Sequence, residues 1–339
     1  MDDSKKSDGQ LGDSPTLPSW IDKDLIQQAV RNAGDEKSLV VAIHVSSATV
    51  AGDNYASSVY RVKATLTDGK ERSFIIKGPV PGEMMASMTK ESGIFRRETI
   101  MLADIIPKME ALLEEAAPGR FPPLAPRCYH SGSEPVEFIV AQDLTDDDFR
   151  IADRKRGLGL RHSLVALRSL ARFHGASYAL LKRQPGLADA LDNNWRKSFD
   201  GVQAFLDAEF QAVANACRTW PGFEQYAERL EKYKSVAMER FTALNDPAPD
   251  AFNVITHGDF WVNNMMFRYA DGWPSEHRAI DLQLSHVASP ALDILYFFAG
   301  SLSEDVHVHH QDLLLREYYF ELKETMELLG HEVTLLQST

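Results

Sequence analysis

Three polar side chains in the C-terminal third of the sequence have the types and the spacing that phosphoryl transfer needs. Asp259 and Asn264 lie five positions apart in the segment His-Gly-Asp-Phe-Trp-Val-Asn-Asn (257–264), and Asp281 follows in Ile-Asp-Leu-Gln (280–283). This reaction requires a carboxylate that orients or deprotonates the attacking hydroxyl, and oxygen ligands that hold Mg²⁺ against the phosphates of ATP. We therefore predict Asp259 and Asn264 as catalytic residues, with Asn264 and Asp281 as Mg²⁺ ligands.

Two other residues of the same segment offer alternatives. His257 beside Asp259 could belong to a hydrolase metal site, but no His or Glu follows at the spacing of metal ligands. We therefore interpret His257 as a structural residue. Asn263 adjoins Asn264 but lacks the five-residue offset from Asp259, so it is the weaker candidate for the metal.

Lys77 and Glu98 are the residues expected to anchor the phosphates of ATP. Lys77 ends a predicted strand over 73–77, and Glu98 lies on the helix predicted after it. An ion pair between them would hold the ammonium group over the α- and β-phosphates. Taken alone, such a lysine is usually a solvated charge and such a glutamate pairs with a neighbouring arginine. The motif around Asp259 favours the functional interpretation.

The loop 51–57, between the first two predicted strands, is expected to cover the nucleotide. Its backbone N–H groups, with Asn54, Tyr55 and Ser57, would lie over the phosphates. The loop matches neither a Walker A motif nor a glycine-rich dinucleotide motif. Its position between strands, rather than its composition, therefore carries the prediction.

Two acidic residues border the predicted helical half. Asp143 and Leu144 follow a hydrophobic strand, where a hinge would offer backbone hydrogen bonds to adenine, although a plain linker is compatible with the same residues. Asp293 follows in Ser-Pro-Ala-Leu-Asp (289–293). Its carboxylate is expected either to be stabilised by a helix dipole or to accept hydrogen bonds from the catalytic segment, and both roles are compatible.

The first half of the sequence predicts a small antiparallel sheet with helices. Ile21, Leu25 and Ile26 have helical spacing, and a helix over 94–106 is expected to end at Pro107. Alternating and apolar runs predict strands, with a hairpin turn over 67–70. The predicted strands are 39–43, 59–66, 73–77, 128–130 and 136–141.

After residue 144 the pattern becomes helical, which predicts an α+β fold with two lobes. Helices are expected over 163–181, 195–244, 290–300 and 311–329, with two short strands around the catalytic segment. We predict a disordered N-terminus (1–17), a nucleotide-binding small lobe (18–143) and a large lobe with the catalytic loop and substrate pocket (144–339). The cleft between the lobes is the expected ligand site.

Composition excludes several classes of function. The 339 residues carry a formal net charge of -13, which argues against a nucleic-acid partner. No apolar run reaches the roughly 20 residues of a membrane span, and the first ten residues lack the apolar core of a secretory signal. Two cysteines form no disulfide framework, so we expect a cytoplasmic protein without a membrane partner. Oligomeric state cannot be read from the sequence.

Taken together, these motifs resemble the ecdysteroid kinase-like (CHK kinase-like) family, which is related to choline and aminoglycoside kinases. The resemblance covers about residues 20–330 and keeps the family's order of motifs. The segments that carry it are 52–57, 74–77, 95–98, 170–177, 257–264 and 289–293. It implies a protein-kinase-like two-lobed fold, ATP and Mg²⁺ as cofactors, and phosphorylation of an alcohol group on an ecdysteroid or a similar secondary alcohol.

The resemblance implies that Asp259 is the catalytic base, and it leaves some differences. Leu282 stands where the family usually has Phe, and Gln142 where an acidic residue is more usual. Family members also usually continue for several helices beyond Thr339, which would pack on the large lobe and wall the substrate site. In this respect the C-terminus looks shortened.

Two alternatives stay open on the sequence. A protein kinase is less favoured, because the interval from Asp281 to Ser289 is too short for an activation segment and no Ala-Pro-Glu motif follows. A nucleotide- or steroid-binding protein without turnover is the other. The substrate wall is expected to draw on Trp261 and on aromatic residues within 195–244, which suit a sterol or a choline-like cation equally.

Overall fold

The computed structural model describes residues 18–48, 57–80, 93–191, 200–248 and 251–332. Its first part is a five-stranded sheet in the order β1-β2-β3-β5-β4, in which every neighbouring pair is antiparallel. The strands are β1 (Val40–Ser47), β2 (Ser58–Leu66), β3 (Glu71–Gly78), β4 (Cys128–Gly132) and β5 (Phe138–Gln142). The predicted strands are therefore present, and the hairpin turn joins β2 to β3.

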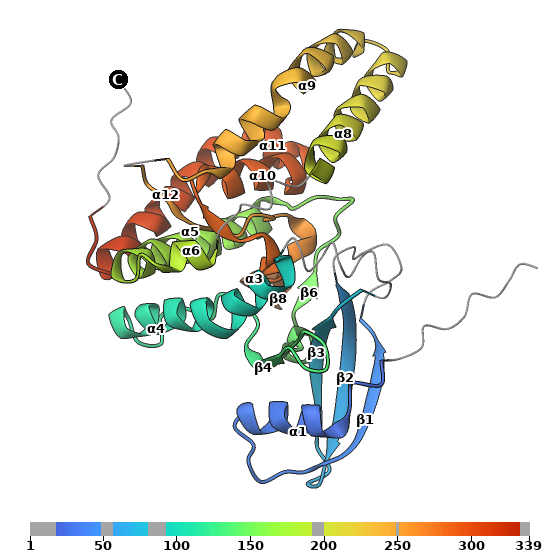
Figure 1. Ribbon diagram of the computed structural model, residues 1–339. Coiled ribbons are helices and arrows are strands. Elements are labelled where there is room, and N and C mark those ends of the chain that lie inside the picture. The colour runs from blue at the N-terminus through green and yellow to red at the C-terminus, as the bar shows by residue number, and fades with distance from the viewer. Residues whose placement is uncertain (1–17, 49–56, 81–92, 192–199, 249–250, 333–339) are drawn as a thin grey trace, which may run out of the picture.

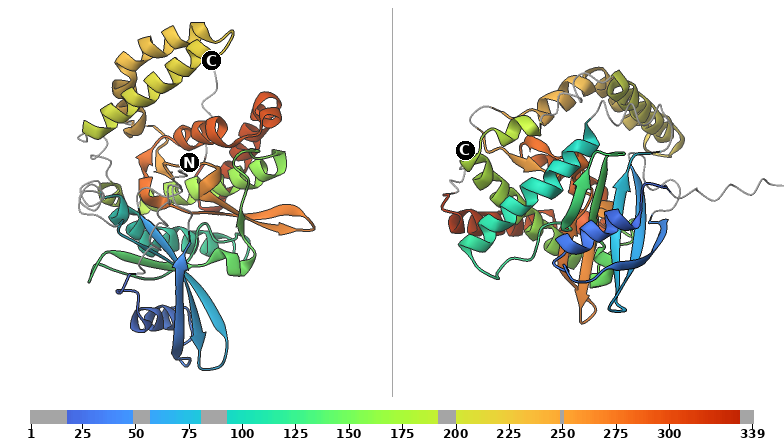
Figure 2. Two further views of the ribbon diagram at one scale, coloured as in Figure 1. Left: turned by 90° about the vertical axis from the view of Figure 1, so that its right-hand side faces the viewer. Right: turned by 60° about the horizontal axis from the view of Figure 1, so that its bottom comes forward.

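Helix α1 (Lys23–Asn32) packs against this sheet, as the spacing of its apolar residues predicted. Asp22 caps its N-terminus by accepting a hydrogen bond from the Leu25 N–H. Ile26, Ala29 and Val30 are buried against the sheet and form a core belonging to this lobe. Figure 2 shows α1 lying across the strands.

The helix after β3 continues through Pro107, where the sequence predicted its end. Helix α3 (Ile94–Ile100) passes into a π-helical turn (Met101–Ile105) and then into α4 (Ile106–Ala116). The Ile106 N–H bonds the carbonyl of Met101, five residues back. The wider turn places Pro107 at the start of α4, where a proline costs no hydrogen bond.

The second part of the chain is mainly helical (Figure 1). Helix α5 packs along α12, and short strands and 3-10 turns carry the segment between residues 254 and 288. A third strand, β9, lies beyond the two that the sequence predicted, and it leads directly to Asp281. The elements are α5 (Leu160–Arg183), α6 (Leu187–Ala190), α10 (Ala291–Ser301), α11 (Glu304–His309), α12 (Gln311–Leu328), β6 (Arg150–Ile151), β7 (Val254–Thr256), β8 (Met265–Ala270), β9 (Trp273–Ala279) and β10 (His286–Ala288).

Helices α8 (Asp200–Thr219) and α9 (Glu224–Asn245) form a hairpin that projects at the top of Figure 1. Their contact buries its own small cluster, made of Ala214, Cys217 and Ala227. None of the helices in the described part of the chain is long and apolar enough to cross a membrane.

One hydrophobic core runs between the two parts of the chain. It joins α3 and α4 to α5, β7 and the segment after Asp281, through Phe95, Met101, Phe173, Leu180, Ile255 and Leu282. A second core fills the helical part alone, between α5, α10, α12 and strands β8 and β9. The fold is therefore the predicted α+β arrangement, with a small antiparallel sheet and a larger helical part. The predicted domain boundary after Asp143 stays a prediction.

Candidate active site

The predicted catalytic segment (257–264) is a loop between strands β7 and β8, and we call it the catalytic loop. It begins at His257 and ends in a 3-10 turn (Val262–Asn264). The Asn264 side-chain amide donates to the Asp259 carboxylate (2.8 Å) and to the Asp259 carbonyl (3.0 Å). The five-residue spacing thus closes the loop on itself and brings the two predicted catalytic residues into contact.

Asp259 lies in a largely buried position that favours proton binding. Burial is the main cause that raises the pKa of its carboxyl, and the charge of Asp281 adds to it. The hydroxyl of Tyr296 and the amide of Asn264 oppose this rise through hydrogen bonds to the carboxyl. No pattern in the sequence indicated Tyr296, which reaches Asp259 only because α10 packs beside the 3-10 turn.

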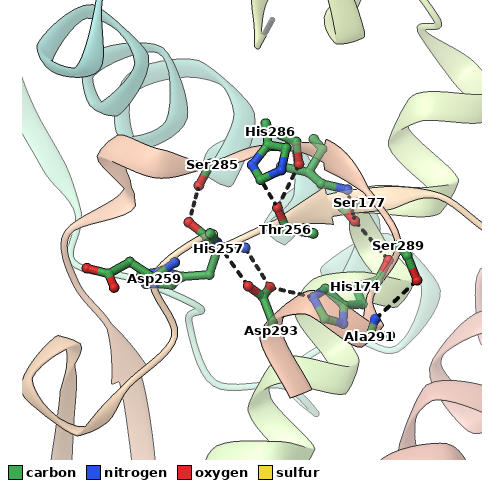
Figure 3. Close-up of polar contacts among 12 residues, drawn as sticks. His174, Ser177, Thr256, His257, Asp259, Ser285, His286, Ser289, Ala291 and Asp293 are labelled. Atoms are coloured by element: carbon green, nitrogen blue, oxygen red, sulfur yellow. Dashed lines mark hydrogen bonds and ion pairs between the residues drawn. The ribbon is translucent and has the colours of Figure 1, made fainter. Parts of the chain in front are cut away.

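Asp293 holds the catalytic loop from behind (Figure 3). Its carboxylate accepts hydrogen bonds from the N–H groups of His257 (2.7 Å) and Gly258 (2.9 Å). It also contacts His174 Nε2 on helix α5 (2.9 Å), and both side chains are buried. Asp293 therefore fixes the loop backbone, and it also lies in the first turn of α10, where the role beside a helix N-terminus was expected.

The conformation of Gly258 explains why the loop needs a glycine there. Its φ is +82°, and a Cβ atom would collide with the backbone of Leu284. This close approach lets the Ser285 hydroxyl bond the carbonyl of His257 (3.3 Å). In Figure 3 the Asp259 side chain points away from these contacts, so the loop is fixed on one side and presents its carboxylate on the other.

Lys77, Glu98 and Asp281 meet at one point, which includes the predicted ion pair between Lys77 and Glu98. The Lys77 ammonium lies 2.6 Å from Glu98 Oε1 and 2.9 Å from Asp281 Oδ1. Burial alone would lower the pKa of Lys77, but the two carboxylates outweigh it and raise that pKa. The ammonium therefore stays charged, and it connects strand β3, helix α3 and the segment that follows β9.

Arg97 supports this arrangement although the sequence suggested no role for it. The residue is buried on α3, and its guanidinium donates to the Gln283 carbonyl (3.1 Å). Gln283 belongs to the 3-10 turn Leu282–Leu284 after Asp281, and α3 packs against that turn. Asp281 itself has a φ of 66°, which is uncommon for a residue other than glycine.

The structure describes only some of the other residues predicted to contact the nucleotide. Asn54 and Tyr55 lie outside the described residues. Ser57 is buried just before β2, and its hydroxyl oxygen has no hydrogen-bond partner among the described residues. Asp143 uses its carboxylate to bind Arg61 (2.6 Å) and Ser73 (2.6 Å). Its side chain therefore braces the sheet, which leaves the backbone of Asp143 and Leu144 as the predicted contact with adenine.

The polar groups at Asn264 and Asp281 fit Mg²⁺ better than a metal held by the protein alone. Across the described residues no cluster of three or more His, Cys, Asp or Glu side chains could hold a metal. Mg²⁺ keeps several waters and commonly binds through one or two protein oxygens and substrate phosphates. Because the Asn264 amide nitrogen is occupied by Asp259, its oxygen is the atom left for a cation.

Comparison with known proteins gives two results at different levels. No curated protein is significantly similar in sequence. Similar solved structures include an aminoglycoside phosphotransferase of the APH(3'')-Id type from Streptomyces rimosus, with 14% identity, a TM-score of 0.37, and coverage of 90% of this chain and 95% of that one. Another is a GDP complex of a mutant aminoglycoside 2'-phosphotransferase-IIIa, with 11% identity, a TM-score of 0.43, and coverage of 91% and 96%.

Likenesses at these TM-scores do not define a relationship, but the family comparison does. The profile of the ecdysteroid kinase-like family matches residues 51–331. The match spans most of the chain, including β3, the catalytic loop and Asp293. The chain therefore belongs to the ecdysteroid kinase-like family, as its motifs indicated.

Proposed function

We propose that the protein transfers the γ-phosphoryl group of ATP to an alcohol group of a small molecule. The observation that carries the proposal is the position of Lys77, whose ammonium lies 2.6 Å from Glu98 and 2.9 Å from Asp281. This contact joins the residue expected to hold the phosphates to a residue expected to hold Mg²⁺. Membership of the ecdysteroid kinase-like family supports the same chemistry.

In the proposed step, Asp259 receives the proton of the acceptor hydroxyl. The acceptor oxygen forms a bond to the γ-phosphorus while the bond from that phosphorus to the leaving oxygen of ADP breaks. Asn264 orients the Asp259 carboxylate through its 2.8 Å hydrogen bond, and burial raises the pKa of Asp259, which makes it a stronger base. Asp293 keeps the loop backbone in place but does not contact the reacting atoms.

Lys77 and Glu98 position the nucleotide in this scheme. Lys77 binds the α- and β-phosphates, and Glu98 fixes its side chain. Asn264 and Asp281 would hold Mg²⁺, which when bound neutralises charge on the phosphate oxygens. The finer proposal for the acceptor is an ecdysteroid or a similar secondary alcohol, which the family supports.

The test is phosphoryl transfer from ATP to a panel of ecdysteroids, sterols, glycosides and choline, read by mass spectrometry. Asp259→Asn should lower the rate about a hundredfold or more, because it removes the base while keeping the shape of the side chain. Asp271→Asn is the matched control, since Asp271 is exposed on the turn between β8 and β9 and should leave the rate unchanged.

The same assay separates the alternatives. A phosphorylated product that disappears only in Asp259→Asn supports the proposal and names the acceptor class. Equal rates in the two variants would show that Asp259 is not the base. Binding of Mg²⁺–ATP without product from any compound would favour a nucleotide-binding protein without turnover.

A further inference from the structure

A second polar site lies on the helical part, away from the catalytic loop. Between α5, α12, strands β8 and β9 and the segment 119–123 there is an open hollow of about 610 Å³. Four arginines line it, together with two glutamates; these are Arg120, Arg172, Arg268, Arg278, Glu276 and Glu321. None of the residues placed in the catalytic site lines this hollow. We call it the arginine hollow.

The charges that face the arginine hollow do not balance. Four guanidinium groups meet two carboxylates in the lining, on a chain whose formal net charge is -13. Glu276 is shared, because it pairs with both Arg268 and Arg278. Arg120 reaches outside the lining set to Glu324 (2.5 Å). Three carboxylates therefore pair with the four guanidinium groups, which leaves one positive charge without a carboxylate of its own.

Arg278 has the most costly position among the four. It is only 6% exposed, and its guanidinium donates to Glu276 (3.0 Å) and to the His277 carbonyl (3.0 Å). Burial, followed by repulsion from Arg268 and Arg172, lowers the pKa of Arg278 to about 10, although Glu110 and Asp147 partly offset this. A buried guanidinium among like charges is stabilised when an anion binds beside it.

Arg172 contributes a guanidinium group to the lining of the hollow. It contacts Glu321 of α12 through Nε (2.8 Å). Its guanidinium carbon also lies 5.9 Å from the centre of the Phe121 ring, and that of Arg120 lies 5.2 Å from the same ring. The Phe121 ring therefore adds an apolar wall beside the cations.

We propose that the arginine hollow binds a small phosphate monoester with an apolar body. Arg172, Arg268 and Arg278 would hold the phosphate, and Phe121 would contact the apolar portion. A phosphate monoester carries nearly two negative charges at pH 7, and it would supply the counter-charge that Arg268 and Arg278 lack while they share Glu276. A guanidinium group can donate two parallel hydrogen bonds to the oxygens of one phosphate. A hollow of this volume accommodates an organic ligand rather than a bare ion.

The phosphate ester class also has a connection to the catalytic site. A phosphate monoester of an apolar alcohol is the class of product that the proposed transfer would form. This link rests on the proposed function, whereas binding in the arginine hollow does not. A binding measurement without acceptor or turnover therefore tests the hollow alone.

The experiment is titration of the full chain with phenyl phosphate by calorimetry, with Mg²⁺–ADP present at saturation to occupy the nucleotide site. Arg172→Gln should weaken binding about tenfold or more, since it removes a charge-assisted hydrogen bond. Arg168→Gln is the matched control, because Arg168 forms the equivalent α5–α12 ion pair with Glu317 one turn away and does not line the hollow. It should change binding less than about twofold.

Glu321→Gln separates ligand binding from a purely structural role. If the α5–α12 ion pair only maintains the fold, loss of either partner should have the same effect. If the hollow binds a dianion, loss of the Glu321 charge should tighten binding by about threefold or more while loss of Arg172 weakens it. Thermal unfolding of each variant shows whether it is folded. If Arg172→Gln is not folded, Arg268→Gln replaces it, because Arg268 is also assigned to the phosphate and its side chain is exposed.

Several results would overturn the proposal. These are no binding to the wild-type chain, equal weakening in Arg168→Gln and Arg172→Gln, or weaker binding in Glu321→Gln. Phenyl sulfate, with one charge fewer, should bind more weakly than phenyl phosphate, and inorganic phosphate should do so because it lacks the ring. Binding to vesicles with phosphatidic acid, but not to soluble phenyl phosphate, would replace the soluble ester with a lipid headgroup.

Discussion

The catalytic loop and the α8–α9 hairpin are held by opposite means. In the loop, the backbone of His257 and Gly258 is bonded to the buried Asp293, and Asp293 is bonded to the buried His174. The hairpin rests on a cluster of small side chains between its own two helices. It leaves large aromatic residues exposed near its tip, namely Trp220, Phe223 and Tyr226.

This difference distinguishes the residues proposed for the reaction from the exposed residues of the hairpin. As the proposed base, Asp259 would need to keep its position to within a fraction of an ångström. The loop backbone beside it is held by the buried Asp293. The aromatic residues at the hairpin tip pack on one another, with 5.9 Å between the ring centres of Trp220 and Phe223. Their positions affect few other residues. Substitutions should therefore have large effects around the loop and small effects on the hairpin.

The largest effect on stability is expected from Asp293→Ala. The change leaves two buried N–H groups and His174 without their acceptor, which should lower the free energy of unfolding by about 3–5 kcal/mol. Denaturation in urea measures it. Asp305→Ala is the control, because Asp305 is 77% exposed and 3.8 Å from its partner His310. If Asp293→Ala lowers the free energy of unfolding no more than Asp305→Ala does, the catalytic loop is not held more firmly than the exposed surface.

The stabilisation from Asp293 should depend on pH in a defined direction. Burial opposes its ionisation, but the hydrogen bond and charge of His174, the charge of His257 and the Gly258 N–H lower its pKa below 3.8. Because the folded-state pKa is depressed, the stabilisation is complete above the unfolded pKa and is lost as the pH falls through the folded value. The stability gap between wild type and Asp293→Asn should therefore narrow from about pH 5 downwards. A gap that widens on acidification contradicts this assignment.

A smaller effect is expected from Tyr296→Phe. The substitution removes a hydrogen bond to the Asp259 carboxyl but keeps the ring in place. Transfer should slow by about fivefold, which corresponds to about 1 kcal/mol. Tyr226→Phe, at the exposed hairpin tip, should leave the rate unchanged. Steady-state rates with a saturating acceptor compare the two, and equal losses would mean that Tyr296 has no special relation to Asp259.

The smallest effect is expected from Trp220→Ala. The side chain is 52% exposed and its ring contact is with Phe223. The substitution should therefore change the free energy of unfolding by less than about 0.5 kcal/mol. Urea denaturation beside Asp293→Ala gives the comparison directly. A loss of several kcal/mol would show that the hairpin is part of the cooperative core.

Local patterns in the sequence predicted the parts that depend on neighbouring residues. Alternation over 59–66 predicted β2. The five-residue offset singled out Asp259 and Asn264, and the structure places their side chains 2.8 Å apart, a contact that had not been predicted. The prediction that the helix ends at Pro107 was wrong, because a π-helical turn accommodates the proline. That turn depends on packing of the helix and has no local sequence pattern.

The rest of the site depends on contacts between residues distant in sequence. The contacts of Asp293 with the catalytic loop and with His174 depend on the packing of α10 and α5. Tyr296 was missed because its relation to Asp259 follows from the position of α10. The arginine hollow collects Arg120, Arg172, Arg268 and Arg278 from separate elements, so no short motif contains it.

Helix α5 has a consequence for inhibitor chemistry. His174 on this helix bonds Asp293 behind the catalytic loop, and Arg172, two residues earlier, faces the arginine hollow. A compound that fills the hollow and shifts α5 would act on the loop without entering the nucleotide site. With ATP as the proposed donor, such a compound would not compete with it, and its selectivity would come from residues outside the proposed catalytic site.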